Sequence, residues 1–205
     1  MTGVQTCALP ISLKILLWAC IAIYPQSYPF RSISVAEGLQ DLIVNALYKD
    51  SLGYIWIGTA SSLERFDGVH LKSFPIPEEG KRKDVNTIIE MPGHELWMGN
   101  RTGLWKVNGE KLLRVAADTI RSGVYSLCSD GKGTLYIGSE SGLFIYNSKG
   151  VERILLDPNV LSGANFIMGM ALDDRDILWV ITRKGLYSVV LSGKSILFHP
   201  CLMNG

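Results

Sequence analysis

The chain has 205 residues, of which 47% are hydrophobic, and its formal net charge at pH 7 is +1. This length and composition suffice for a globular protein with a sizeable core. A surface that binds nucleic acid needs an excess of basic residues, which this chain lacks. We therefore expect no contact with nucleic acid.

The first 27 residues predict a leader rather than part of a folded domain. Residues 1–11 have no relation to the rest and resemble a translated sequencing adaptor, so we expect an assembly artefact there; the alternative is a disordered native leader. Residues 12–27 place Lys14 before the apolar run 15–23, a pattern typical of a signal peptide and too short to span a bilayer. The remaining residues, 28–205, are expected to fold after export.

Residues 30–35 then predict one strand that belongs to no repeat. In propellers that close their ring, an N-terminal strand often completes the last blade. The four repeats described next each predict a fourth strand of their own, so the partner of this segment is expected beyond Gly205. On this interpretation the chain is a fragment of an unfinished ring.

One pattern occurs four times along the chain. Its anchor aromatics, Trp56, Trp97, Tyr136 and Trp179, are 41, 39 and 43 residues apart. A repeat of about forty residues made of short strands is the signature of β-propeller blades. We therefore predict an all-β fold, a partial β-propeller with four four-stranded blades near residues 42–74, 83–115, 122–154 and 165–199. Three further apolar columns keep the same register: Val44, Val85, Val124 and Ile167; Leu47, Ile88, Leu127 and Met170; Leu63, Leu104, Leu143 and Leu186.

The first copy predicts strands at Val44–Tyr48 and Tyr54–Gly58, a third strand from Leu63, and a fourth at Val69–Phe74. Between the last two, Asp67-Gly68 predicts a tight hairpin in which both residues have positive φ. The corresponding turns are predicted at Asn108-Gly109, in a longer loop at Asn147–Gly150, and at Ser192-Gly193.

Strands such as 96–98 and 177–181 are apolar on both faces, so each sheet needs a cover on both sides. A radial stack of blades supplies that cover, and large aromatics suit the space between blades. We therefore expect Trp56, Trp97 and Trp179 to pack in the core rather than to bind a ligand.

The residue types needed for catalysis or metal binding do not come together in the sequence. His70, His94 and His199 are too far apart to have metal-ligand spacing, and the acidic residues near Asp130 and Asp173 fall in turns. The chain has no Gly-rich phosphate loop, nucleophile elbow or Cys-His arrangement. We expect no enzyme active site, no metal and no cofactor in these residues.

The motifs of the first copy resemble the opening blade of the two-component regulator propeller family. They are Gly38–Asp41, Val44-Asn45, Asp50–Thr59 and Leu63–Gly68. The first copy departs from the pattern at Ser62, where the other copies have Gly. The fourth departs at Ile181, where the other copies have Gly. The resemblance extends over residues 30–199 and is strongest in the first blade.

This resemblance implies the extracytoplasmic sensor of a hybrid two-component sensor histidine kinase. Such proteins have two seven-bladed propellers, an immunoglobulin-like domain, a membrane helix, a kinase core, a receiver and a DNA-binding domain. The chain would then hold the signal peptide and just over half of the first propeller. The implied location is the periplasm, with the membrane reached only through downstream segments, and the implied partners are a second copy in a homodimer and a glycan breakdown product.

Two sets of loops are expected to share one face of the propeller and to carry the ligand site. Within them, Arg101, Glu140, Arg183 and Lys184 are the candidates to bind an oligosaccharide or an anionic sugar; the alternative is that they are solvated loop residues. A protein-interaction propeller and an enzyme propeller, such as a lyase or a quinoprotein, remain open as other functions. The loops are 59–62, 100–102, 139–141 and 182–184 within blades, and 75–84, 116–123 and 155–166 between blades.

Overall fold

The structure is a computed structural model that describes residues 30–77, 83–190 and 198–201. Four antiparallel sheets of four strands each confirm the predicted all-β architecture of blades. The first contains β1 (Val44–Lys49), β2 (Ile55–Thr59), β3 (Leu63–Phe66) and β4 (Leu71–Phe74), and the second β5 (Val85–Met91), β6 (Glu95–Asn100), β7 (Gly103–Asn108) and β8 (Lys111–Val115). The third contains β9 (Val124–Ser129), β10 (Leu135–Ser139), β11 (Gly142–Asn147) and β12 (Gly150–Ile154), and the fourth β13 (Ile167–Leu172), β14 (Ile177–Thr182), β15 (Gly185–Val190) and β16 (Phe198–Cys201).

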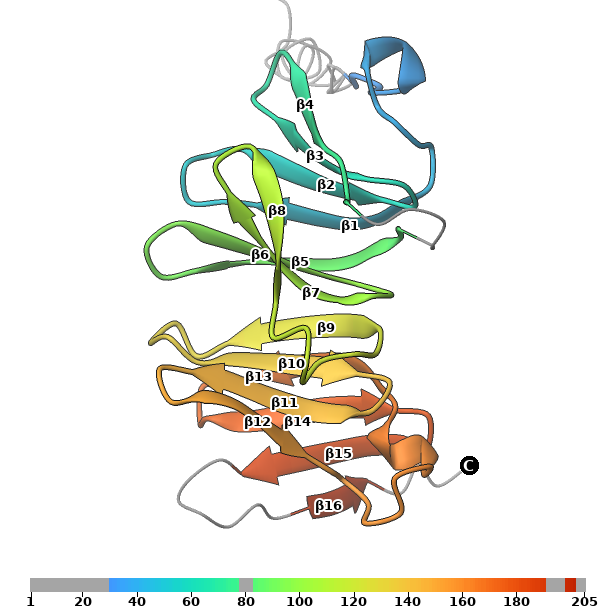
Figure 1. The fold of residues 1–205 in the computed structure, drawn as a ribbon, viewed down its shortest axis with the longest axis vertical. Coiled ribbons are helices and arrows are strands. Elements are labelled where there is room, and N and C mark those ends of the chain that lie inside the picture. The colour runs from blue at the N-terminus through green and yellow to red at the C-terminus, as the bar shows by residue number, and fades with distance from the viewer. Residues whose placement is uncertain (1–29, 78–82, 191–197, 202–205) are drawn as a thin grey trace, which may run out of the picture. The chain divides into compact units, whose positions relative to one another are not determined.

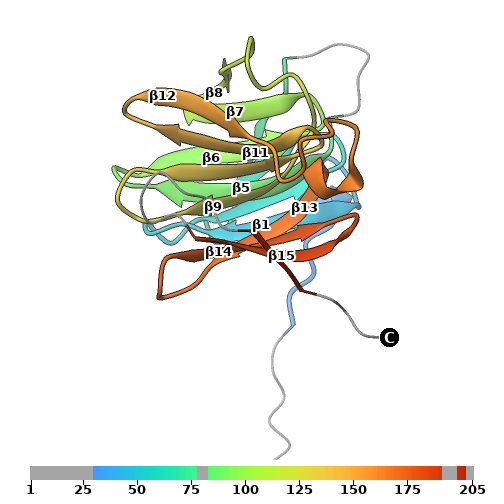
Figure 2. The ribbon, with the colours of Figure 1, turned by 90° about the horizontal axis from the view of Figure 1, so that it is seen from below.

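Successive sheets lie face to face in chain order (Figure 1). The first strands of neighbouring sheets contact each other, β1 with β5, β5 with β9 and β9 with β13. Figure 2 shows the same stack from the side of the fourth sheet. Sheets that meet through their first strands are arranged as propeller blades are, with the first strand innermost.

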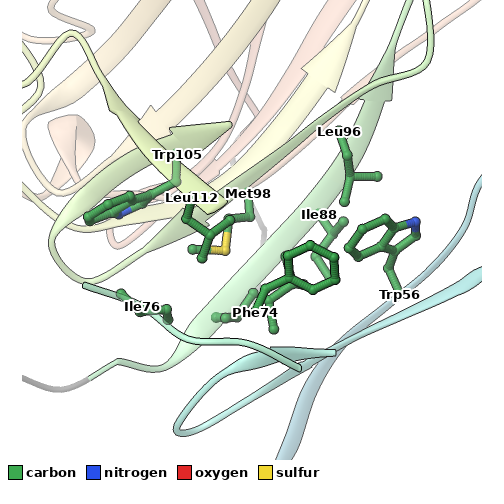
Figure 3. Close-up of a cluster of buried hydrophobic side chains, with 10 residues drawn as sticks. Trp56, Phe74, Ile76, Ile88, Leu96, Met98, Trp105 and Leu112 are labelled. Carbon is green, nitrogen blue, oxygen red and sulfur yellow. The ribbon is translucent and has the colours of Figure 1, made fainter. Parts of the chain in front are cut away.

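Large apolar side chains fill the space between neighbouring blades. Between the first two, Trp56 and Phe74 of one blade meet Ile88, Leu96 and Met98 of the next (Figure 3). The Trp56 and Phe74 rings are 5.2 Å apart between centroids. Trp56 and Trp97 are buried, at 4% and 2% exposure, as predicted for packing residues, and Tyr136 is buried as well. Trp179, the third tryptophan expected in the core, is only half-buried.

The glycine that follows the anchor aromatic is required by the next blade. A Cβ added to Gly58 would lie 2.6 Å from the Val85 side chain, and one on Gly99 would lie 2.4 Å from Val124. The third blade repeats the approach between Gly138 and Ile167 at 2.5 Å. No side chain fits in that space, so the glycine and the first apolar residue of the following blade form one packing unit. In the fourth blade Ile181 takes this position and is 50% exposed.

The turn between the first and second strands of each blade has a left-handed residue in its fourth position. Gly53 and Gly133 have φ of +93° and +110° there, and His94 and Asp176 have φ of 60° and 58°. In the first, third and fourth blades an aspartate begins the turn and accepts two backbone N–H groups inside it. These bonds explain the acidic residues that the sequence places in turns.

Residues 30–35 form no strand within this chain, and the strand partner expected beyond Gly205 stays a prediction. Ser34 instead caps a short 3-10 helix, η2 (Val35–Glu37). The Ser34 N–H and hydroxyl donate to the Glu37 carboxylate at 2.7 and 2.6 Å, and the Ser34 Oγ accepts the Ala36 N–H. This capping box satisfies the backbone N–H groups of Ser34 and Ala36 locally.

The hairpins between the third and fourth strands also differ from expectation. Gly68 has φ of +100° but Asp67 does not have positive φ, and β4 begins at Leu71 because the Asp67 carboxylate accepts the N–H groups of Val69 and His70. In the second blade only Gly109 has positive φ, since Asn108 still pairs in β7. In the third blade Asn147 pairs with Gly150, so the loop is a two-residue turn and shorter than predicted.

Three expectations lie outside the described residues: the adaptor sequence at 1–11, the signal peptide at 12–27 and the turn at Ser192-Gly193. Within the described ranges, no helix has the length and apolar character needed to span a membrane.

Candidate functional site

The predicted loops do share one face, which we call the loop face. The loop after the second strand of a blade bonds to the linker that leads into the same blade. Arg101 forms an ion pair with Asp84 at 3.0 Å in the second blade. In the other three blades the contact is a backbone hydrogen bond: Ala60 to Ile43 at 3.0 Å, Glu140 to Gly123 at 3.1 Å and Arg183 to Phe166 at 3.3 Å.

Two aromatic side chains form the centre of the candidate site on this face. Tyr125 of β9 and Phe166, just before β13, pack with ring centroids 5.3 Å apart. The Arg183 guanidinium lies over the Phe166 ring at 3.7 Å from its centroid. The Tyr125 hydroxyl donates to Glu140 Oε1 at 2.6 Å. Side chains from the third and fourth blades thus converge on one half-buried aromatic pair.

The charges around Tyr125 oppose one another. Burial raises the pKa of the Tyr125 hydroxyl, and its hydrogen bond to Glu140 and the charge of that carboxylate raise it further. The charges of Arg101 and Arg183 act on the same hydroxyl and lower its pKa. Two guanidinium groups and one carboxylate therefore surround the pair, and Tyr125 stays a neutral hydrogen-bond donor at physiological pH.

The structure brings two of the four predicted site residues to the aromatic pair. Glu140 binds the Tyr125 hydroxyl and Arg183 lies over the Phe166 ring, whereas Arg101 pairs with Asp84 at 3.0 Å and the Lys184 ammonium group is 3.5 Å from the Asp157 carboxylate. Lys184 therefore pairs with the linker of its own blade. Its assignment as a binding residue finds no support in this contact.

Buried polar side chains fix the loops that carry these charges. Asn100 Oδ1 accepts the N–H groups of Thr102 and Gly103 at 2.8 and 3.0 Å, and the Ser139 hydroxyl donates to the Gly142 carbonyl at 2.9 Å. Arginines of the outer strands hold the same loops from the other side. Arg114 Nη2 donates to the Thr102 carbonyl at 2.6 Å, and Arg153 Nε donates to the Ser141 carbonyl at 2.9 Å.

Asn165 fixes the linker that ends at Phe166. It is fully buried at the end of the 3-10 helix η3 (Gly163–Asn165). Its Oδ1 accepts the N–H groups of Leu156 and Asp157, and its Nδ2 donates to the carbonyls of Asp157 and Asn159. The linker is folded around this one amide, which places Phe166 beside Tyr125.

The aromatic pair was not predicted from the sequence. A signal was present, because Tyr125 stands in a column that holds Asn45, Asn86 and Met168 in the other blades. An aromatic residue in a column otherwise free of aromatics indicates a role outside the shared packing. Phe166 gave no such signal, since it ends a linker whose length differs between blades.

Residues 38–61 match the two component regulator propeller family. The chain carries a two-component regulator propeller repeat. No curated protein sequence matches the chain. The matched segment covers η2's C-cap, β1 and β2, where the sequence resemblance is strongest.

Solved structures share the fold of this chain. The extracellular domain of the hybrid two component system BT4673 from Bacteroides thetaiotaomicron is 22% identical with a TM-score of 0.66, over 78% of this chain and 22% of that one. Virginiamycin B lyase from Staphylococcus aureus is 15% identical with a TM-score of 0.63, over 80% and 58% of the two chains. PorZ, a surface component of the type-IX secretion system of Porphyromonas gingivalis, is 17% identical with a TM-score of 0.62, over 87% and 30%.

At these identities the likeness shows the propeller fold alone. The chain also spans only 22% to 58% of the length of these three structures. Within the described residues, no group of three or more His, Cys, Asp or Glu side chains is placed to hold a metal ion.

Proposed function

We propose that this chain is part of the extracytoplasmic ligand-sensing propeller of a hybrid two-component sensor histidine kinase. The loop-face site around Tyr125 then binds a glycan breakdown product. The regulator propeller repeat supports the sensor role. The observation that carries the binding role is the convergence of Glu140 and Arg183 on the pair of Tyr125 and Phe166, with the charge of Arg101 acting on the same Tyr125 hydroxyl.

The chemistry of the site suits a sugar. Half-buried aromatic rings pack against the C–H face of a pyranose, while polar groups at their rim fix its hydroxyls. The Glu140 carboxylate accepts hydrogen bonds from the sugar hydroxyl groups. The Arg101 and Arg183 guanidinium groups donate to ring or hydroxyl oxygens and form bidentate bonds to a carboxylate of an acidic sugar.

Sensing requires more than binding. The ligand must bind one arrangement of the receptor more tightly than the other, because equal affinity for both shifts no equilibrium. We propose a homodimer in the periplasm, in which occupied loop faces favour the arrangement that changes kinase activity and so transcription. In this proposal the kinase, the receiver and the DNA-binding domain are parts of the full-length receptor.

The test is calorimetry on the intact protein with a panel of neutral and acidic oligosaccharides. Arg183→Ala removes the cation over Phe166 and is expected to weaken binding by about tenfold or more, or roughly 1.4 kcal/mol. The matched control is Arg175→Ala, which removes an exposed arginine from a turn on the opposite face. Equal affinity of the wild type and an Arg101→Ala/Arg183→Ala double variant for every sugar that binds would refute this site.

The likeness to a lyase keeps an enzyme propeller as the second candidate. Ser51, His94 and Glu90 do lie together, with Ser51 Oγ 2.8 Å and Glu90 Oε1 3.1 Å from the same His94 Nδ1. A catalytic relay uses both ring nitrogens, one for the nucleophile and one for the carboxylate. This cluster is therefore not arranged as a hydrolytic triad. Recovery of a bound oligosaccharide unchanged after long incubation favours the sensor, and its cleavage the enzyme.

A further inference from the structure

A second candidate site lies between the first two blades, on the face opposite the loop face. The turns between β1 and β2 and between β7 and β8 border it. The cavity there has a volume of about 200 Å³ and is partly open to solvent. Tyr54, Trp56, Leu96 and Arg65 are among its lining residues, and Figure 3 shows Trp56 and Leu96 facing each other across the two blades.

Arg65 is the group in this cavity that lacks a charge partner. Its guanidinium carbon lies 4.3 Å from the centroid of the Tyr54 ring and 5.8 Å from that of Trp56. Its Nε is buried and has no hydrogen-bond partner. Within the described part of the chain, no carboxylate forms an ion pair with it. Stacking on two aromatic rings holds the guanidinium in place but leaves its N–H groups without acceptors.

The two carboxylates that also line the cavity are bound to other donors. Asp50 accepts the backbone N–H groups of Leu52 and Tyr54 and the indole N–H of Trp56. Glu90 accepts the backbone N–H and the hydroxyl of Ser51 at 2.8 and 2.6 Å. They stabilise the turns on the cavity rim and do not neutralise Arg65.

The second blade shows how the same position looks when its charge is compensated. Lys106 replaces Arg65 there, and Glu95 replaces Tyr54. The Lys106 ammonium group and the Glu95 carboxylate form an ion pair at 2.7 Å. The first blade keeps the cation but has an aromatic ring where the acid would be. The unpaired charge is therefore specific to the first blade rather than a property of the repeat.

We infer that this cavity binds a small monocarboxylate that carries a single ring. A guanidinium held over an aromatic ring presents a planar fork, and a carboxylate matches that fork with two hydrogen bonds. The aromatic and aliphatic walls favour a ring as the body of the ligand, and about 200 Å³ leaves room for one ring. The carboxylates of Asp50 and Glu90 on the cavity wall disfavour a second negative charge on the ligand, which selects a monoanion over phosphate or another dianion.

The experiment measures binding of benzoate and glucuronate to the intact protein by calorimetry. Benzyl alcohol and glucose serve as uncharged counterparts, and inorganic phosphate as the dianion. Arg65→Gln removes the charge while keeping the length of the side chain, and Arg65→Lys keeps the charge while removing the fork. Lys106→Gln is the matched control at the same position of the next blade. Unfolding curves of each variant verify that it is folded.

We expect at least one of the two carboxylates to bind, and Arg65→Gln to weaken it by about tenfold or more, with a smaller loss in Arg65→Lys and no change in Lys106→Gln. Preference between benzoate and glucuronate identifies an aromatic acid or a sugar acid as the ligand. No binding of either carboxylate below about 10 mM overturns the inference. The inference is also overturned if Arg65→Gln does not weaken carboxylate binding. It is overturned equally if an uncharged counterpart or phosphate binds with the same affinity as the carboxylates. The loop-face proposal is unaffected by these outcomes, because its variants lie on the other face.

Discussion

The hydrogen bond between Asp50 and Trp56 offers a sharp test of what holds the blades together. The Trp56 indole N–H donates to Asp50 Oδ2 at 2.7 Å, and both residues are buried. Asp50→Asn keeps Oδ1 for the backbone N–H groups of the turn but directs an NH₂ group at the indole N–H. A buried hydrogen bond to a charged group contributes about 1.5–3 kcal/mol, so we expect a loss of that size in the free energy of unfolding.

The third blade supplies the control for this prediction. Asp130 makes the same two turn bonds, to Lys132 and Thr134, but the aromatic residue of its blade is Tyr136, which has no indole N–H. Asp130→Asn is therefore expected to cost less than about 1 kcal/mol. Urea unfolding followed by circular dichroism measures both variants against the wild type. Equal losses in the two variants would show that the turn bonds, and not the indole bond, carry the energy.

Three further predictions concern other buried or strained groups. Burial raises the pKa of the fully buried Glu64 carboxyl, so the native state keeps this proton up to a higher pH than the unfolded chain does. The free energy of unfolding therefore falls as pH rises from the ordinary pKa of a glutamate to the raised one. Glu64→Gln is thus expected to stabilise the protein at neutral pH by on the order of 1 kcal/mol and to give no gain below the ordinary pKa, as measured by urea unfolding at both pH values. Asp176 has φ of 58°, so Asp176→Gly is expected to raise stability by up to about 1 kcal/mol, whereas Asp174→Gly in the same turn lowers it; a loss of stability in Asp176→Gly as large as that in Asp174→Gly, measured by thermal unfolding, would contradict the strain argument. The Trp97 indole N–H is buried without an acceptor, so Trp97→Phe is expected to cost roughly 1.5–3 kcal/mol less than Trp56→Phe, and equal costs would show that this N–H is solvated in the native state.

The fold could be predicted because packing between blades leaves a regular trace in the sequence. Each glycine after an anchor aromatic meets the first apolar residue of the next blade, as Gly58 meets Val85, so both columns recur at the blade period. The turns were predicted less accurately than the fold, because capping side chains determine their length and conformation. The Asp67 carboxylate, for example, holds a four-residue loop where a two-residue hairpin was expected.

The candidate site could be predicted in part for a similar reason. Topology places the loops after the second strands on one face, so charged residues there, such as Arg101 and Arg183, could be selected from the sequence. The aromatic pair of Tyr125 and Phe166 depends on two blades meeting, and the position of Phe166 depends on the fold of its linker around Asn165. Contacts between segments that are far apart in sequence do not follow from strand periodicity.

Departures from the repeat separate residues that serve packing from residues that serve recognition. Met91 replaces the turn aspartate of the other blades and leaves the indole N–H of Trp97 buried without an acceptor. Met91 itself is buried in the same hydrophobic cluster as Trp97, so this departure serves packing. Tyr125 and Tyr54 also break their columns, but each change creates a partly open aromatic surface beside a guanidinium group. A departure that exposes binding chemistry is what both proposed sites require, and within the described residues Tyr125 supplies one on the loop face and Tyr54 one on the opposite face.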